Sequence, residues 1–342
     1  MRDTAAQDVA KICGFVLLCF LAAAAFSPAV YQLGKGFALA MQHGDAGEFA
    51  GWLSEKALKA DFPVYFKRTL MVTAFLLIVP LVYSLKMEVD PRKLRESRFS
   101  IYLPEIVRDR RVGQPLAKNS EWWRHLGLGL LISCAVFLLM ALFLIQLGWF
   151  QWKADASSAE AAKGFGKALL PAAVIAGVEE ALFRGALLGV FLRAFKPRWA
   201  IALLALLFAA VHFLQPPDGA VVDAPGEPGS GFQMLQLIGE KFLQPEPMLY
   251  GFASLFLVGL ILGHARVGTA SLWLPIGLHA GWVISLKTFG SIAKRHPELP
   301  EKYDFFIGET LVEGAMPLVA LTVTWGILMF LVLRHKNDDS LV

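Results

Sequence analysis

Long runs of apolar residues alternate with short polar breaks along most of this chain, and each run has about the length of a helix that crosses a hydrocarbon core. The composition agrees, since 56% of the 342 residues are hydrophobic and only 18% are charged. These values exclude a soluble enzyme, a disordered chain and a secreted disulfide scaffold. We therefore expect an all-α polytopic membrane protein. The pattern predicts eight transmembrane helices, at about 12–33, 67–86, 125–150, 166–193, 199–214, 247–265, 268–289 and 311–333.

Lysine and arginine are distributed unevenly between the two sides of the predicted membrane. With the N-terminus inside, the inner segments hold 18 of these residues and the outer segments hold 13. The positive-inside rule then favours cytoplasmic termini in an inner or plasma membrane. The inner excess comes mostly from loop 87–124, which is either an ordinary solvated loop or a dock for anionic headgroups. The first run also resembles a signal peptide around Ala22 to Ala25, but its charged region is weak, so we keep it as a span.

The chain divides into three parts on this pattern. Residues 1–164 hold the first three helices, 165–290 hold the fourth to seventh, and 291–342 hold the eighth helix and a short tail. Residues 215–246 are rich in proline and glycine, so we expect irregular backbone there, outside the hydrocarbon or in a water-filled cavity. No soluble domain of useful size remains.

Three ionisable residues lie together in the fourth predicted span, namely Glu179, Glu180 and Arg184. An ionised side chain at mid-bilayer costs about 2.5–3.5 kcal/mol on insertion scales, so such residues are functional candidates. Glu180 and Arg184 are four residues apart on one helical face, where they can form an ion pair. Glu179 points about 100° away, and its own neighbour four residues on is the apolar Phe183. We expect Glu180 to orient Arg184 and Glu179 to act as a general base, the alternative being that all three only join helices.

Two histidines lie in other predicted spans, His212 at the end of the fifth and His279 in the middle of the seventh. Counted from the inner ends at about 1.5 Å per residue, Glu179, His212 and His279 lie at depths of roughly 21, 20 and 17 Å. A carboxylate and two imidazoles therefore reach a similar depth from three spans. This convergence predicts one buried polar site among helices four, five and seven.

Three ordered motifs resemble those of the CPBP intramembrane proteases, the family of CAAX prenyl endopeptidases and bacteriocin-processing or self-immunity proteins, also called Abi. The motifs are Glu179-Glu180-x-x-x-Arg184, Phe208-x-x-x-His212 and His279. The resemblance covers about 165–290. It implies that Glu179 and His212 activate a water molecule for attack on a peptide carbonyl, while His279 polarises the carbonyl and stabilises the oxyanion.

The chain departs from this family at one position. Family members usually carry Asn or Asp four residues after the last histidine, and here that residue is Val283. The indole N–H of Trp282 is a candidate replacement, although packing is the favoured interpretation of this side chain. A fold retained without protease activity is therefore an alternative.

The metal dependence stays open at this point. Glu179, His212 and His279 with an open fourth position would form an acceptable catalytic zinc site. A metal-free site would use the same residues, with water activated directly. We favour the metal-free interpretation and require no cofactor, because the adjacent ligand pairs of zinc proteases are absent from the sequence.

The leading hypothesis is an intramembrane endopeptidase that cleaves a membrane-associated protein or peptide. The alternatives are a non-catalytic membrane scaffold or immunity protein and an ion-coupled transporter with a proton relay. Against the transporter, the sequence shows no repeat symmetry. The expected partners are this substrate and the lipid bilayer, without nucleic acid. Prenylation of the substrate is not implied.

Overall fold

The computed structural model describes residues 5–42, 47–85, 122–217, 219–243, 249–269, 271–308 and 311–338. Helices dominate these residues, and the strands among them are two of three residues each. The all-α prediction is therefore confirmed. The chain divides into two compact units, of which the first comprises Met1–Met87 and Val211–Glu246 and the second Glu88–Ala210 and Pro247–Val342.

The first unit contains the helices α1 (Ala5–Gln42), α2 (Glu48–Lys59), α3 (Phe62–Ser84) and α9 (Ser230–Lys241). The core of this unit joins α1, α3 and α9 through Phe20, Ala24, Phe66, Met234 and Ile238. Gly231 lies so close to α1 that a Cβ there would be 1.8 Å from the Ala24 carbonyl oxygen. The first turn of α9 thus requires glycine at this contact.

Helix α9 corrects the expectation of irregular backbone throughout 215–246. The buried positions of α9 include Gly231, Met234 and Ile238, which are spaced by three and four residues as on one helical face. The proline-rich and glycine-rich composition indicated a loop, whereas the regular apolar spacing after Ser230 determines a helix. Helix α2 was also absent from the prediction, because it is short and carries charged residues that break the apolar pattern.

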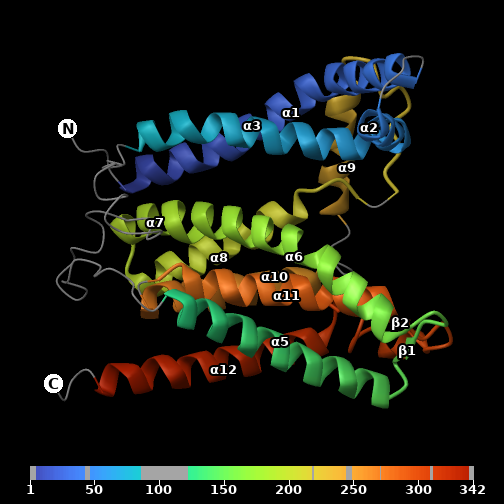
Figure 1. The fold of residues 1–342 in the computed structure, drawn as a ribbon. Coiled ribbons are helices and arrows are strands. Elements are labelled where there is room, and N and C mark those ends of the chain that lie inside the picture. Colours follow the sequence, from blue (N-terminus) through green and yellow to red (C-terminus); the bar gives the residue numbers. More distant parts are fainter. Residues whose placement is uncertain are drawn as a thin grey trace. The chain divides into compact units, whose positions relative to one another are not determined.

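The second unit is a helical bundle around α11 (Trp273–Ile292), coloured orange in Figure 1. Helix α11 packs against α5 (Trp122–Gln146), α6 (Ser158–Glu180) and α10 (Leu249–Thr269). The other helical elements are the π-helix η2 (Ala181–Leu187), α7 (Leu188–Ala194), the 3-10 turn η4 (Glu301–Tyr303), α12 (Ala315–Asp338) and α8 (Pro197–Phe213), whose residues from Val211 on belong to the first unit.

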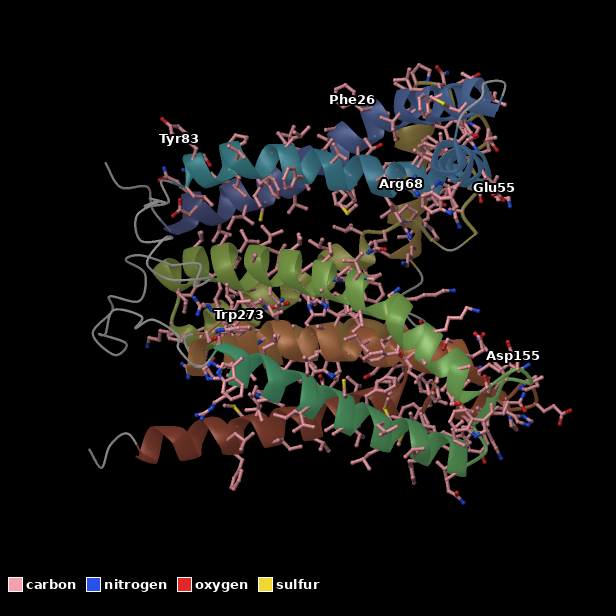
Figure 2. All side chains as sticks on the ribbon, in the orientation of Figure 1. Phe26, Glu55, Arg68, Tyr83, Asp155 and Trp273 are labelled. Carbon is pink, nitrogen blue, oxygen red and sulfur yellow. The ribbon has the colours of Figure 1, made fainter. Side chains whose placement is uncertain are left out.

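The antiparallel strands β1 (Phe150–Trp152) and β2 (Ala293–Arg295) pair with Phe150 opposite Arg295. They follow α5 and α11, so they join the ends of these two helices. The side chains of Trp273, at the start of α11, and Asp155, in the turn before α6, lie at opposite ends of this unit in Figure 2.

Four helices of the described chain are long and apolar enough to cross a membrane, namely Gln7–Met41, Phe62–Leu81, Trp122–Gln146 and Leu249–Thr269. They coincide with four of the eight predicted spans. Pro197–Phe213 and Ala315–Leu331 are shorter apolar helices at two further predicted spans. These features are those of a polytopic membrane protein. Most of the basic loop 87–124 lies outside the described residues, and the cytoplasmic position of the termini stays a prediction.

Helices α5 and α11 approach each other through glycines. A Cβ on Gly277 would be 2.3 Å from the Leu126 carbonyl oxygen, and a Cβ on Gly129 would be 2.6 Å from that of Leu274. Backbone atoms cannot move aside as the end of a flexible side chain can. Small residues are what allow two membrane helices to pack at this distance.

Replacing Gly277 with alanine is expected to lower the free energy of unfolding by about 1–3 kcal/mol, because the added methyl group forces the two backbones apart. Gly290 of α11 is the matched control, since a Cβ there meets nothing within 4 Å. Gly290→Ala should instead stabilise by about 0.5–1 kcal/mol through helix propensity. Denaturant titration in bicelles measures both variants, and equal effects would contradict the close crossing.

Candidate active site

One continuous helical segment, formed by α6, η2 and α7, carries the acidic motif. It starts at Ser157, whose hydroxyl accepts a hydrogen bond from the backbone N–H of Glu160. The two glutamates are the last residues of α6, and the π-helix begins directly after them. π-helical turns inside α-helices occur frequently at functional sites.

The predicted ion pair between Glu180 and Arg184 is present. The Nη1 atom of Arg184 donates to Oε1 of Glu180 at 2.9 Å, and neither side chain is more than 1% exposed. The guanidinium group also lies over the ring of Phe208, 4.5 Å from its centroid. A buried pair of this kind is costly to break, because the remaining charge stays in a dry environment.

His279 contacts the same carboxylate from α11. Its Nδ1 atom is 2.9 Å from Oε1 of Glu180. An ionised carboxylate can only accept hydrogen bonds, so Nδ1 carries the proton and Nε2 is the atom left to face the site. A carboxylate that holds an imidazole in this way fixes its tautomer and its orientation.

Glu179 lies on the other side of the same imidazole. Its Oε2 atom is 4.0 Å from Nε2 of His279. The Glu179 side chain is 28% exposed, whereas that of Glu180 is fully buried and that of His279 is 10% exposed. The two glutamates therefore differ as the helical spacing predicts: Glu180 is fully buried, whereas Glu179 is partly exposed, although its Oε2 atom beside Nε2 is buried.

Phe208 of α8 forms the aromatic wall of this cluster. Its ring packs edge to face against Phe183 at 5.0 Å and against His279 at 6.4 Å between centroids. The side chain is 1% exposed. Phe208 thus shields the buried ion pair and limits the positions open to the imidazole.

The other predicted site residues lie as follows. His212 is in the last turn of α8, beyond Ala210 and among the residues of the first unit, so its part in the site stays a prediction. Trp282 packs against the apolar cluster shared by α5, α10 and α12, in line with the packing interpretation. Val283 packs against the small residues of α6 and α11.

A metal site was one of the two interpretations of the sequence. Within the part of the chain that the structure describes, no three or more His, Cys, Asp or Glu side chains are placed to hold a metal ion. The hydrogen bond between Oε1 of Glu180 and Nδ1 of His279 leaves Nε2 of His279 beside Glu179, and these two residues belong to the predicted zinc set. The metal dependence of this site therefore stays a prediction.

The sequence interpretation missed two contacts from α10. Nη2 of Arg184 donates to the Gly259 carbonyl oxygen at 3.3 Å, and Nε of Arg266 donates to the Arg184 carbonyl oxygen at 3.4 Å. From the sequence, Arg266 was counted only among the lysine and arginine residues of the segments on the inner side of the membrane. The available signal was a charged residue in a largely apolar segment, three positions after Gly263.

Comparisons with known proteins give the final observation on this site. The search of curated proteins and the search of solved structures each returned no match. The family models gave a match over the segment that carries the motifs, and it supports a protease in an integral membrane protein. The resemblance inferred from the motifs is confirmed: residues 161–285 match the family model described as type II CAAX prenyl endopeptidase Rce1-like.

Proposed function

We propose that this protein is an intramembrane endopeptidase that hydrolyses a peptide bond through a water molecule activated by Glu179. The observation that carries the proposal is the imidazole of His279, held at Nδ1 by Glu180 with its Nε2 atom 4.0 Å from Glu179. A structural ion pair between Glu180 and Arg184 needs neither this histidine nor a second, partly exposed carboxylate. The family match over 161–285 supports the same reaction class.

The proposed reaction assigns one task to each group. Glu179, with His212 as the resemblance implies, takes a proton from water as the oxygen atom attacks the carbonyl carbon. Doubly protonated His279 keeps its Nδ1–H on Glu180 and presents Nε2–H to the oxyanion that forms. The proton on Glu179 then passes to the leaving nitrogen as the C–N bond breaks, which restores the carboxylate. No step in this scheme requires a metal.

The proposed substrate is a membrane-associated protein or peptide, since the residues that carry the reaction belong to helices of a membrane protein. A non-catalytic scaffold is the second candidate, and the observation that favours it is Val283, which packs among apolar side chains and offers no donor to an oxyanion.

Terminal-peptide mass spectrometry separates these two candidates. Membranes from cells with the wild-type protein should contain specific new protein termini, and these termini should disappear with Glu179→Gln or His212→Ala at matched expression. Glu160→Gln, an exposed carboxylate on the same helix, should leave them unchanged. Identical termini in all four samples would establish the scaffold and refute the protease.

A further inference from the structure

Arg266 is a buried cation outside the motifs that identify the site. It lies in the last turn of α10, and the residue is 5% exposed. Among the described residues it makes no ion pair with a carboxylate, and its hydrogen bond goes to a backbone atom, the Arg184 carbonyl oxygen. Burial of an arginine is costly, so a contact of this kind calls for a specific role.

The Arg184 carbonyl lies inside the π-helix, where the usual pairing is shifted. In an α-helix the N–H of Leu188 would donate to the carbonyl of Arg184, four residues earlier. Here it donates to the carbonyl of Phe183, five residues earlier. The N–H of Leu188 therefore does not serve the Arg184 carbonyl, and Nε of Arg266 donates to this oxygen.

Helix α10 holds the π-helix by two hydrogen bonds that run in opposite directions. The Gly259 carbonyl accepts from the Arg184 side chain, and the Arg266 side chain donates to the Arg184 backbone. Gly259 and Arg266 are seven residues apart and therefore share one face of α10. Gly259 lies against α8, where a Cβ would be 2.8 Å from Cα of Ala205, so this attachment point is fixed by packing.

We propose that Arg266 is a positioning residue: it holds η2 in its π-helical register and thereby keeps Arg184 and Glu180 aligned with His279. The chain of contacts runs from Arg266 to the Arg184 backbone, from the Arg184 side chain to Glu180, and from Glu180 to the imidazole. The consequence for turnover rests on the proposed peptidase function, whereas the consequence for the helix does not.

Three substitutions separate the hydrogen bond from the charge. The amide nitrogen of glutamine is bonded to Cδ, as is Nε of arginine, so Arg266→Gln keeps a donor at the same position without the charge. Arg266→Lys keeps the charge but has a carbon atom there, and Arg266→Met has neither. Thr269→Ala is the control on the same helix, because the Thr269 hydroxyl donates to the Ala265 carbonyl and accepts from the Ser271 backbone N–H, both at the end of α10.

Hydrogen–deuterium exchange of the full chain in lipid nanodiscs tests the register without any substrate. Exchange of the amides in 181–188 should rise about tenfold or more in the Lys and Met variants, as expected for loss of one buried hydrogen bond. It should stay near the wild-type rate in the Gln and Thr269→Ala variants, and amides of α5 should be unchanged in all four. Equal exchange in the Gln and Met variants would overturn the proposal.

Turnover gives the second reading, with a peptide that spans the cleaved bond found by terminal-peptide analysis. The kcat of the Lys and Met variants should fall about tenfold or more with little change in KM, whereas the Gln variant should retain most of the wild-type kcat. A higher kcat in the Lys variant than in the Gln variant would show that the charge matters, and it would overturn the proposal. If the wild type cleaves nothing, the proposed function fails, and the exchange experiment alone decides the role of Arg266.

Discussion

Glu180→Gln is expected to lower turnover of the cleaved peptide by about 10²- to 10⁴-fold, the range found when the carboxylate that orients a catalytic imidazole is removed. Glu180 contacts Nδ1 of His279 at 2.9 Å and fixes which nitrogen faces Glu179. A glutamine can meet this imidazole with either its oxygen or its NH₂ group, so the Nδ1–H of His279 is no longer held in one orientation. KM should change little, because Glu180 is fully buried and does not reach the substrate.

The kcat of purified protein in nanodiscs measures this effect, and circular dichroism confirms that the helices remain. Glu160→Gln is the matched control, since Glu160 lies on the same helix but pairs with Lys163 at the surface. Its kcat should equal that of the wild type. A Glu180→Gln protein with unaltered kcat would show that the contact with His279 is structural only.

Arg184→Met is expected to lower the free energy of unfolding by about 3–5 kcal/mol, because it leaves the Glu180 carboxylate charged and buried without its cation. Both side chains are at most 1% exposed, so water cannot compensate. The double variant Arg184→Met, Glu180→Gln should recover part of the loss, since the stranded charge is then removed as well.

Denaturant titration in bicelles measures these differences. The exposed pair between Lys163 and Glu160 on α6 supplies the control, with Lys163 56% exposed. Lys163→Met should cost about 0–1 kcal/mol, as is usual for a surface ion pair. A cost for Arg184→Met within that range would mean that water reaches the pair.

The local part of the site could be predicted from the sequence. The pairing of Glu180 with Arg184 follows from helical spacing, and so does the divergence of Glu179. The contact between Glu180 and His279 could not be predicted, because it joins residues 99 positions apart and depends on how two helices are rotated about their axes. The similar depth of these residues indicated that they meet, but not through which atoms.

The fold, too, could be predicted from the sequence only in part. Hydropathy located the long apolar helices but not α2 and α9, because apolar length alone distinguishes a span from the polar breaks. It could not detect η2, since a π-helical turn changes the register by one residue and leaves the apolar composition the same. The role of Arg266 depends on that register, so it too was beyond the reach of the pattern.

The burial of the acidic motif also determines when the protein can be assembled during its synthesis. Helix α6 carries both glutamates and is not among the four helices of the described chain that are apolar enough to enter a bilayer by length and composition. Glu180 and Arg184 pair with each other, but their further hydrogen-bond partners lie on α10 and α11, which the ribosome makes later. The segment from Ser158 to Ala194 therefore depends on those later helices for stable insertion. A truncation before α10 would leave this segment without a stable place in the membrane.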